Sequence, residues 1–424
     1  MRMNKQKKGL VPELRFPEFE KEPNWPCVKL NAVAKRSTSK NKGEKITRVL
    51  TNSAVEGVVD QRDYFDKDIA VKGNLESYYI VDKGDYVYNP RISSVAPVGP
   101  VSKNKVGKGV MSPLYTIFRF NSKSNDFFEQ FFKSSRWYGY LQTVSNSGAR
   151  HDRMSITNSE FMAMPVPNPS DMEQQKIADC LASVDELIAL QTQKLDALNA
   201  HKKGLMQQIF PAEGETVPKL RFSEFKDSGE WKSKPLGKVS SFFKGKGIAK
   251  SDTSIGGSLP CIRYGELYTH YNETIDDVIS YTNIPANELV LSNENDVIIP
   301  ASGETQEDIA TASCVLIGGV ALGGDLNIIR SSLNGVFLSY YLNNAKKLDI
   351  AKMAQGISVV HLYPSQLKNL EIIFPEIVEQ EKIASFFAVF DGVIKDQKSR
   401  IEYLKKHKKS LIQKLFPAMD EADL

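Results

Sequence analysis

The chain repeats part of itself at a fixed interval of 206 residues. Residues 11–19 read VPELRFPEF and residues 217–225 read VPKLRFSEF, so seven of nine positions are identical. Residues 173–211 return at 379–417 with 17 of 39 positions identical and no gap. An internal repeat constrains the architecture more than any local pattern does. The chain therefore contains two copies of a frame, which surround two long inserts that hardly resemble each other.

The repeat divides the 424 residues into successive predicted segments. These are a disordered basic arm (1–10), a first globular domain with its frame segment (11–168), a first long helix (169–211), a second globular domain (212–374), a second long helix (375–417) and a short tail (418–424). The predicted fold class is mixed α/β (α+β), with two globular domains joined by two long helices.

Each long helical segment has the apolar spacing of a coiled coil. Residues 173–209 contain no proline, and apolar side chains recur at steps of four and three. That spacing is typical of a helix packed along a second helix. The economical partner of each helix is its own repeat, so we expect an antiparallel coiled coil. Gln191 and Lys202 interrupt the first apolar series, and Gln397 and Lys408 interrupt the second.

The glutamines lie near the middle of each apolar seam. Antiparallel packing would bring Gln191 and Gln397 together, where they could hydrogen-bond to each other and fix the register of the helices. The alternative is that each glutamine faces water at an open point of the seam.

Both inserts are predicted to be mixed α/β. The strands expected in the first insert are 46–50, 77–81, 85–88 and 115–120, followed by a helix at 125–141. Those expected in the second are 259–263, 296–300, 312–317 and 327–330, followed by a helix at 334–353. Each insert then ends in a polar, glycine-containing loop. The shared order indicates two versions of one domain.

Charge is distributed unevenly between the inserts. Residues 26–165 carry a net charge of +8, whereas residues 232–370 carry −1. A basic domain is typical of a protein that binds a polyanion such as nucleic acid. A run of lysines between 232 and 250 has no acidic residue among them. That run is either a nucleic-acid contact or an ordinary solvated surface.

Several classes of protein are disfavoured by what the sequence lacks. No apolar run approaches the ~18–20 residues of a membrane-spanning helix, and the basic N-terminus has no apolar signal core. The four cysteines form no CxxC pair and are expected to be free thiols. We expect a cytoplasmic protein with no membrane partner, no metal site and no cofactor of its own.

Catalytic motifs are also missing. The sequence has no phosphate-binding GxxxxGK[ST] loop, no GxGxxG after a strand and no HExxH. Asn89-Pro90-Arg91 is the nearest approach to an amino-methyltransferase motif, and it lacks the second proline and the aromatic residue. The chain is therefore expected not to be an enzyme.

The repeated motifs resemble a known family. The frame motif VPxLRF at 11–16 and 217–222, and the helix opening EQxKIA at 173–178 and 379–384, resemble the specificity (S) subunit of type I restriction-modification systems. The resemblance covers essentially the whole chain. It extends to VYNPR (87–91) and SPLY (112–115) in the first insert and to IRYGEL (262–267) and ASGET (301–305) in the second.

The resemblance implies a function in DNA recognition. Each insert would be a target recognition domain that reads one half of a bipartite, asymmetric site on double-stranded DNA, and the paired helices would set the spacer. Two modification subunits, which carry S-adenosylmethionine and methylate adenine, would dock on this chain. Restriction subunits would add ATP-driven translocation and cleavage. The missing catalytic motifs are then expected, because the chemistry lies on other chains.

Candidate DNA contacts follow from the chemistry of recognition. Lys and Arg neutralise phosphates, Arg pairs best with guanine, and Asn or Gln with adenine. The candidates in the first domain are Arg91, Arg150, His151 and Arg153. Those in the second are Lys244, Lys246, Arg263, Tyr264, Ser302, Thr305, Gln306 and His361.

The main alternative is a coiled-coil scaffold or adaptor that binds protein partners rather than DNA. The nearly neutral second insert favours it slightly. A free-standing repressor is disfavoured, because no helix-turn-helix pattern is present and the dissimilar inserts argue against a palindromic site. A single-chain restriction enzyme would need catalytic motifs that the sequence lacks.

Antiparallel packing of the long helices makes a cross-linking prediction. The double variant Gln191→Cys/Gln397→Cys should form a disulfide within one chain on mild oxidation, because antiparallel helices bring the two positions together. A shift in mobility on a non-reducing gel measures it, with each single variant as the control. Failure to cross-link in a folded double variant would count against antiparallel packing.

Overall fold

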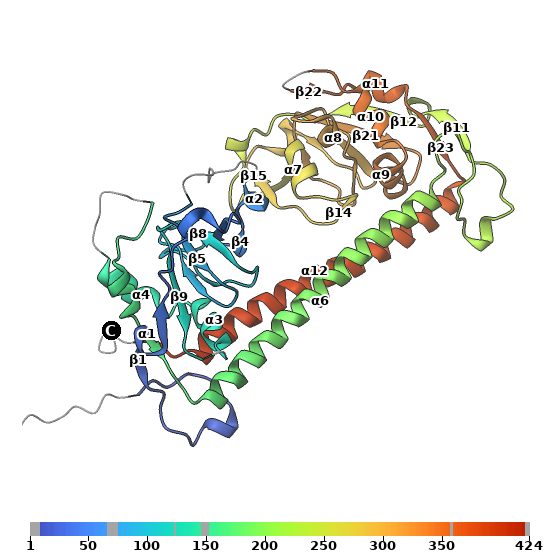
Figure 1. Cartoon of the computed structure of the whole chain (residues 1–424). Helices are drawn as coiled ribbons and strands as arrows, with labels where there is room; N and C mark the ends of the chain where they lie inside the picture. The colour runs from blue at the N-terminus through green and yellow to red at the C-terminus, as the bar shows by residue number, and fades with distance from the viewer. Residues whose placement is uncertain (1–8, 66–74, 123, 146–151, 357–358, 420–424) are drawn as a thin grey trace, which may run out of the picture. The chain divides into compact units, whose positions relative to one another are not determined.

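Two long helices run between the two units of the structure. The computed structural model describes residues 9–65, 75–122, 124–145, 152–356 and 359–419. The units are Met1–Thr192 with Ser399–Leu424, and Gln193–Lys398. Helix α6, Asp171–Ile209, begins in the first unit and ends in the second, and helix α12, Ile377–Leu415, does the reverse (Figure 1). Each unit therefore combines one insert with half of each long helix.

Residues at the helix ends explain where the long helices begin and end. The side-chain oxygen of Ser170 accepts a hydrogen bond from the backbone N–H of Glu173 at 3.4 Å, as N-cap residues do. Phe-Pro follows the last residue of α6 and of α12, and proline cannot continue a helix. The structure contains both long helices, and α6 and α12 lie inside the segments 169–211 and 375–417 that the repeat predicts.

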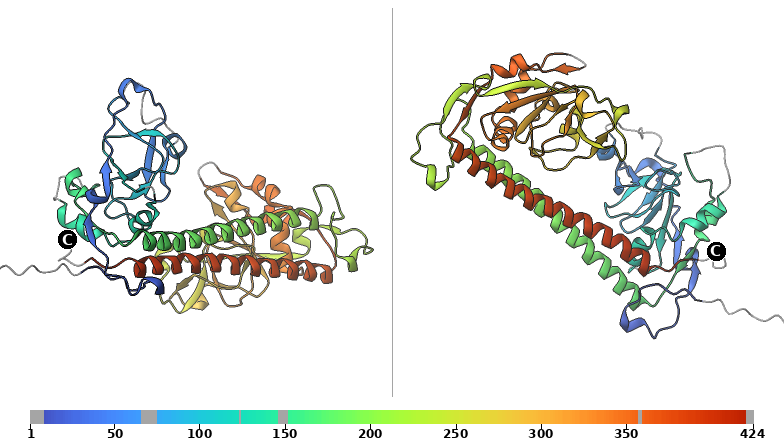
Figure 2. Two further views of the ribbon diagram at one scale, coloured as in Figure 1. Left: turned by 60° about the horizontal axis from the view of Figure 1, so that its bottom comes forward. Right: turned by 180° about the vertical axis from the view of Figure 1, so that it is seen from behind.

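The helix halves of the first unit run antiparallel (Figure 2). Leu14 lies next to Arg15, which pairs with Glu173 early in α6, and the N–H of Leu14 donates to the carbonyl of Lys414 near the end of α12 at 3.0 Å. Further along α6, Asp185 forms an ion pair with Lys408 of α12. Rising numbers on α6 therefore meet falling numbers on α12.

The second unit repeats these contacts with the helices exchanged. The N–H of Leu220 donates to the carbonyl of Gln208 near the end of α6 at 2.9 Å. Lys202 of α6 forms an ion pair with Asp391 of α12 at 2.6 Å. Each contact lies 206 residues from its counterpart in the first unit, so the repeat in sequence is a repeat in contacts.

The first insert forms a four-stranded sheet and two two-stranded sheets. The four-stranded sheet has the order β2 (Ala34–Arg36), β9 (Thr116–Phe120), β6 (Tyr86–Tyr88) and β7 (Val101–Lys103), antiparallel throughout. In the two-stranded sheets, β4 (Gly57–Asp60) pairs with β3 (Leu50–Ser53) and β8 (Gly109–Met111) pairs with β5 (Tyr79–Val81), and an isolated parallel bridge between Val49 and Val110 joins them. The α-helices are α1 (Leu30–Val33), α2 (Gln61–Tyr64), α3 (Asp126–Phe132), α4 (Tyr138–Val144) and α5 (Asn158–Met162), with 3-10 turns at Pro17–Phe19 and Lys42–Glu44.

The second insert has a larger version of the same arrangement. Its main sheet has the order β12 (Ser240–Lys244), β21 (Leu326–Ser331), β17 (Asp296–Pro300), β19 (Ser313–Val315) and β14 (Thr274–Ile275). Its second sheet has the order β15 (Ser280–Thr282), β13 (Leu259–Ile262), β20 (Ala321–Leu322) and β16 (Val290–Leu291). The α-helices are α7 (Tyr264–Thr269), α8 (Gln306–Ile309), α9 (Gly335–Asn344), α10 (Lys347–Met353) and α11 (Pro364–Lys368), with 3-10 turns at Ser223–Phe225, Leu236–Lys238, Lys250–Asp252 and Ala286–Glu288.

The two inserts share one topology. The order β2-β9-β6-β7 corresponds to β12-β21-β17-β19, again antiparallel. The parallel pair β13·β20 corresponds to the isolated parallel bridge between Val49 and Val110. This agreement supports the prediction that the inserts are two versions of one domain.

Each insert enters and leaves the frame through a two-stranded antiparallel ribbon. In the first unit β1 (Cys27–Lys29) pairs with β10 (Pro165–Pro167). In the second unit β11 (Lys232–Pro235) pairs with β23 (Glu371–Phe374). The ends of each insert are therefore neighbours at the frame.

The predicted elements of the inserts are correct in part. The strand predicted at 296–300 is β17, but the strand predicted at 46–50 is wrong, since β3 begins at Leu50. The side chain of Asn41 hydrogen-bonds to both the N–H and the carbonyl of Ile46, at 3.0 and 2.8 Å, which holds that stretch as a loop.

The long helices predicted in the inserts are each interrupted. The helix predicted at 125–141 is divided into α3 and α4, where the hydroxyl of Ser134 donates to the carbonyl of Phe131 at 2.6 Å. The helix predicted at 334–353 is divided into α9 and α10.

The phenylalanine that ends each long helix also anchors it to an insert. The ring of Phe416 lies 5.2 Å from Phe127 and 5.7 Å from Phe131, measured between centroids. Phe210 lies 5.8 Å from Phe337 in the same way. Buried aromatic pairs of this kind add to the apolar area that they remove from water. The phenylalanine that follows each long helix therefore packs in the core of its unit.

A buried ion pair joins the frame motif to the start of each long helix. Arg15 contacts both carboxylate oxygens of Glu173 at 2.8 Å, and Arg221 contacts those of Glu379 at 2.8 and 2.7 Å. The hydrogen bond to Glu173 raises the pKa of Arg15. The indole N–H of Trp25 also donates to Glu173 at 2.9 Å.

The two ion pairs differ in their tryptophans, and this difference makes a prediction. Nε1 of Trp231, the counterpart of Trp25, has no hydrogen-bond partner among the described residues. Glu173→Gln should destabilise the first unit by about 3 kcal/mol, because it leaves a buried arginine without its anion. It should cost about 1 kcal/mol more than Glu379→Gln costs the second unit, since Trp25 also loses an ionic acceptor.

Hydrogen–deuterium exchange of residues 9–29 and 215–235 measures the two local opening free energies separately, which a global unfolding curve of a two-unit protein does not. Equal losses in the two variants would contradict the role given to Trp25.

Candidate nucleic-acid interface

The structure brings two predicted arginines of the first domain together. After β6, the chain runs beside residues 152–154, and Arg91 and Arg153 form an antiparallel bridge. The N–H of Met154 donates to the carbonyl of Pro90 at 2.8 Å. Like charges directly opposite each other on neighbouring strands destabilise the pair. A bound anion would relieve that repulsion, so the pair is suited to phosphate or to the acceptor edge of a base.

Acidic compensation around the arginines is slight. Arg153 contacts the carboxylate of Asp152 at 3.4 Å, and its Nε has no partner among the described residues. The hydrogen bond from Arg153 lowers the pKa of Asp152, and the charge of Arg91 lowers it further. Arg150 and His151, the other predicted contacts of this domain, lie outside the described residues.

Buried asparagines, which the sequence reasoning did not identify as part of the site, hold Arg91 in place. The side-chain oxygen of Asn89 accepts from the N–H of Arg91 at 3.0 Å, and its amide donates to the carbonyl of Asn52 at 2.9 Å. Gly99 has φ +82, and a Cβ there would lie 2.1 Å from the carbonyl oxygen of Asn89. The Asn-Pro-Arg motif is therefore a rigid turn that presents an arginine.

The second domain has different side chains in the equivalent place. After β17, strand β18 (Ser302–Gly303) pairs with β22 (Val360–His361), which sets Ser302 opposite His361. Both residues are predicted contacts. They follow the corresponding strand of the main sheet, as Arg91 follows β6. Ser302 is buried and His361 is exposed.

Tyr363 lies close to two predicted contacts, His361 and Lys244, although the sequence analysis did not select it. Its ring lies 6.4 Å from that of His361 and 6.0 Å from the ammonium nitrogen of Lys244. The tyrosine is 45% exposed. An exposed aromatic ring beside a lysine can stack on a base or position a cation against a phosphate. Its position in the sequence, two residues after His361 at the end of a polar loop, is the signal that could have identified it.

Arg263 and Tyr264 line a cleft of 950 Å³ in the second unit. Glu266 accepts hydrogen bonds from Nε and Nη2 of Arg263 at 3.1 and 2.9 Å, and it also accepts from the hydroxyl of Ser280 at 2.7 Å. These contacts fix the guanidinium group of a side chain that is 26% exposed. A donor held in one orientation is suited to reading a base edge. Glu266, which the sequence reasoning missed, is its positioning residue.

Lys246 projects from a tight loop beside this cleft. The side chains of Lys244 and Lys246 are exposed. A Cβ at Gly245 would lie 1.9 Å from the carbonyl oxygen of Gly323, so this approach requires glycine. Ile248 has φ +63, a strained conformation for a β-branched residue. Strained backbone of this kind is often found at binding sites.

Thr305 has a structural role as the N-cap of α8. Its hydroxyl oxygen accepts from the N–H of Asp308 at 3.1 Å, and the hydroxyl lies 2.7 Å from the carboxylate of Asp308. Gln306 is exposed in the first turn of the same helix. Of these two predicted contacts, Gln306 has the side chain more available to a ligand.

Gln191 and Gln397, the predicted register residues, belong to different units. Gln191 is half-buried and Gln397 is buried. Neither residue is without a partner. Their pairing stays a prediction.

The described residues hold no cluster of His, Cys, Asp or Glu that could bind a metal ion. The thiols of Cys180, Cys261 and Cys314 are free. Burial raises the pKa of Cys261 to about 11 and that of Cys314 to about 12, so these thiols stay protonated. Among the described helices, none combines the length and the apolar character that a membrane span requires.

Comparison with known proteins identifies the family. Residues 31–200 and 228–406 match the family model described as type I restriction modification DNA specificity domain. The putative type I restriction enzyme MjaX specificity subunit of Methanocaldococcus jannaschii is 23% identical over 62% of this chain and 61% of its own length. The MjaIX specificity subunit of the same organism is 24% identical over 76% of each chain.

Solved structures share the fold. A chain from a structure on complex assembly and conformational transition of the type I R-M system has a TM-score of 0.60 at 16% identity, covering 93% of this chain and 98% of that one. The type I restriction-modification S subunit from M. genitalium has a TM-score of 0.54 at 13% identity, covering 97% and 100%. Because the family model matches most of the sequence, including both inserts, this chain belongs to the type I restriction modification DNA specificity domain family.

Proposed function

We propose that the chain is the non-catalytic DNA specificity subunit of a type I restriction-modification complex. Each insert domain reads one half of a bipartite, asymmetric site on double-stranded DNA. The observation that carries this proposal is the equivalent placement of different side chains on one topology. Arg91 and Arg153 occupy the position in the first domain that Ser302 and His361 occupy in the second. One scaffold with two sets of contact residues is suited to two different half-sites.

In the first domain, Arg91 is the candidate base reader. Asn89 and the turn at Gly99 fix its backbone, and a fixed arginine pairs with the O6 and N7 acceptors of guanine. Arg153 lies opposite and supplies charge toward the phosphates. Arg150 and His151 are further candidates in the same loop.

In the second domain, Arg263 is the candidate base reader, because Glu266 holds its guanidinium group in the cleft. Tyr264 lines the same cleft. Lys244 and Lys246 supply the phosphate contacts. The remaining candidates near or beside them are Ser302, Thr305, Gln306 and His361.

The long helices set the spacer between the two half-sites as an antiparallel coiled coil. Each contains 39 residues, which corresponds to ~58 Å of helix, longer than the ~34–36 Å of one turn of duplex DNA. Gln191 and Gln397 fix the register of the two helices at the centre of the seam.

Two modification subunits that bind S-adenosylmethionine dock on the frame, and restriction subunits join them. A frame that occurs twice offers the same docking surface twice. Apolar side chains 206 residues apart are exposed in both copies, namely Met172 with Val378 and Leu187 with Val393. Matching exposed apolar positions support two equal protein partners.

The whole proposal is tested by reconstituting the chain with its modification subunits and mapping methylated adenines genome-wide by single-molecule sequencing. We expect one motif with two unlike halves and a fixed spacer. Methylation without a bipartite motif, in an otherwise active complex, would contradict the proposal. A chain that binds the partner subunits but leaves their DNA preference unchanged would favour the scaffold alternative.

The two candidate readers make a separate prediction. Arg91→Ala should relax specificity at one base pair of one half-site, and Arg263→Ala at one base pair of the other half-site. Each loss should amount to ~1–3 kcal/mol, because a bidentate base contact is removed. Filter binding to duplexes with single base changes measures it. Arg400→Ala removes an exposed arginine of α12 and is the matched control. If Arg91→Ala leaves both affinity and specificity unchanged, Arg91 is not a reader.

A further inference from the structure

A pocket of 460 Å³ in the first unit is lined by four lysines, Lys133, Lys405, Lys408 and Lys409. We name it the lysine groove. Three of these lysines lie on the last turns of α12, and Lys133 follows α3. Val95 and Pro97, from the loop that begins at Arg91, form another wall.

The positive charge of the lysine groove is compensated only in part. Lys408 is paired with Asp185 of α6, and Lys133 contacts the same carboxylate at 3.6 Å and Glu129 at 3.6 Å. Burial lowers the pKa of Lys408, and the charge of Lys133 lowers it further. Lys405 contacts Glu402 at 2.8 Å in solvent, where such a pair contributes little. Among the described residues, no carboxylate lines this pocket and Lys409 makes no ion pair.

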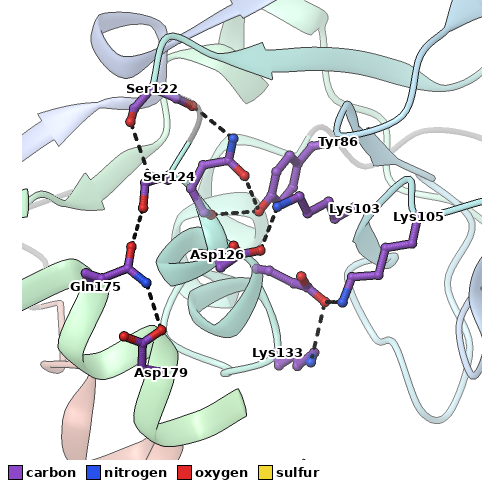
Figure 3. Close-up of polar contacts among 11 residues, drawn as sticks. Tyr86, Lys103, Lys105, Ser122, Ser124, Asp126, Lys133, Gln175 and Asp179 are labelled. Atoms are coloured by element: carbon purple, nitrogen blue, oxygen red, sulfur yellow. Dashed lines mark hydrogen bonds and ion pairs between the residues drawn. The ribbon is translucent and has the colours of Figure 1, made fainter. Parts of the chain in front are cut away.

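A neighbouring hollow of 450 Å³ differs in its charge balance. It shares Val95, Lys133 and Tyr138 with the lysine groove. Its own lysines are neutralised, since Lys103 contacts Asp126 at 2.6 Å and Lys105 contacts Glu129 at 2.6 Å. Figure 3 shows the ammonium groups of Lys103 and Lys105, and that of the shared Lys133, directed at carboxylates. The weakly compensated charge of the region therefore belongs to Lys405 and Lys409 of the lysine groove.

The lysine groove breaks the symmetry of the frame. Residues 405–409 read KKHKK, but their counterparts 199–203 read NAHKK. In the second unit, Lys202 replaces Lys408 and contacts two carboxylates, Glu273 at 3.0 Å and Asp391 at 2.6 Å. A protein partner that docks on both copies of the frame would need the same charges in both. Of the groove lysines on α12, Lys408 and Lys409 correspond to Lys202 and Lys203, and only Lys405 has no lysine counterpart. This added lysine accompanies the basic first insert, which favours a polyanion that meets the two domains differently.

We propose that the lysine groove binds the phosphodiester backbone of duplex DNA, beside the bases that the first domain reads. This inference rests on the proposed function and adds a contact that carries no sequence information. Val95 follows Arg91 by four residues, a span of at most ~14 Å. Duplex DNA carries a phosphate charge every ~1.7 Å of its axis, so a duplex held at Arg91 has phosphates within reach of the groove.

The test is the double variant Lys405→Gln/Lys409→Gln, in complex with the modification subunits. It leaves the buried pair of Lys408 and Asp185 in place. Binding should weaken equally for cognate and non-cognate duplexes, and the slope of log K against log salt should fall by about 2, because two phosphate contacts are lost. The affinity ratio of wild type to variant should therefore shrink about tenfold between about 50 and about 200 mM salt.

The matched control is Lys398→Gln/Lys406→Gln, which removes the same charge from exposed positions of α12 outside the pocket. It should keep the wild-type slope. An unchanged slope in the groove variant, or an equal change in the control, would overturn the inference. Loss of modification-subunit binding with unchanged DNA affinity would assign the groove to a protein partner instead. If the proposed function is wrong, the unaltered complex will show no preference for a bipartite duplex. If only the groove inference is wrong, the unaltered complex will keep that preference and the groove variant will keep the wild-type salt slope.

Discussion

The buried pairs of Arg15 with Glu173 and of Arg221 with Glu379 are the contacts on which the rest of the structure depends. Each joins the frame segment that precedes an insert to the helix that follows it. A buried charge is tolerated only when its counter-charge and hydrogen bonds are in place. The frame segment and the helix start must therefore form together, and this closes the chain around the insert. The backbone N–H of Leu14, next to Arg15, then binds the end of the other helix.

The ion pairs between α6 and α12 fix the relative orientation and register of the two helices. Lys408 with Asp185 and Lys202 with Asp391 are related by the repeat, with the two helices exchanged. In the second unit Asp391 also accepts from the hydroxyl of Tyr340 on α9, which links the helix pair to the insert. Polar pairs on an otherwise apolar seam favour one register over its neighbours, because a shifted register would bury the charges unpaired.

The sequence predicts the frame better than the inserts. The 206-residue repeat, the apolar seam and the Phe-Pro ends together predict two long helices, because these signals are local and occur twice. Lys202 and Lys408 were recognisable only as interruptions of the seam, since their partners Asp391 and Asp185 lie on the other helix. The stretch at Ile46 is a loop and not the predicted strand, because the side chain of Asn41, five residues earlier, hydrogen-bonds to its backbone, and apolar alternation does not report such a contact.

The candidate sites show the same limit. Arg91 and Arg263 can be chosen from the sequence as candidate DNA contacts because of their residue type. Asn89 and Glu266, which hold them in position, are identified only by their hydrogen bonds in the folded chain. The bridge between Arg91 and Arg153, and its counterpart between Ser302 and His361, depends on strand pairing across some sixty residues. No periodicity in the sequence reports such pairing.

The two-stranded ribbons β1·β10 and β11·β23 have a consequence for how such a chain can change. Each ribbon places the entry and the exit of an insert side by side. Another domain with adjacent ends could therefore replace the insert between the same two strands. The ion pair at Glu173 or Glu379 would still form, because both of its partners belong to the frame. An exchanged domain would bring its own contact residues, and the frame would need no change.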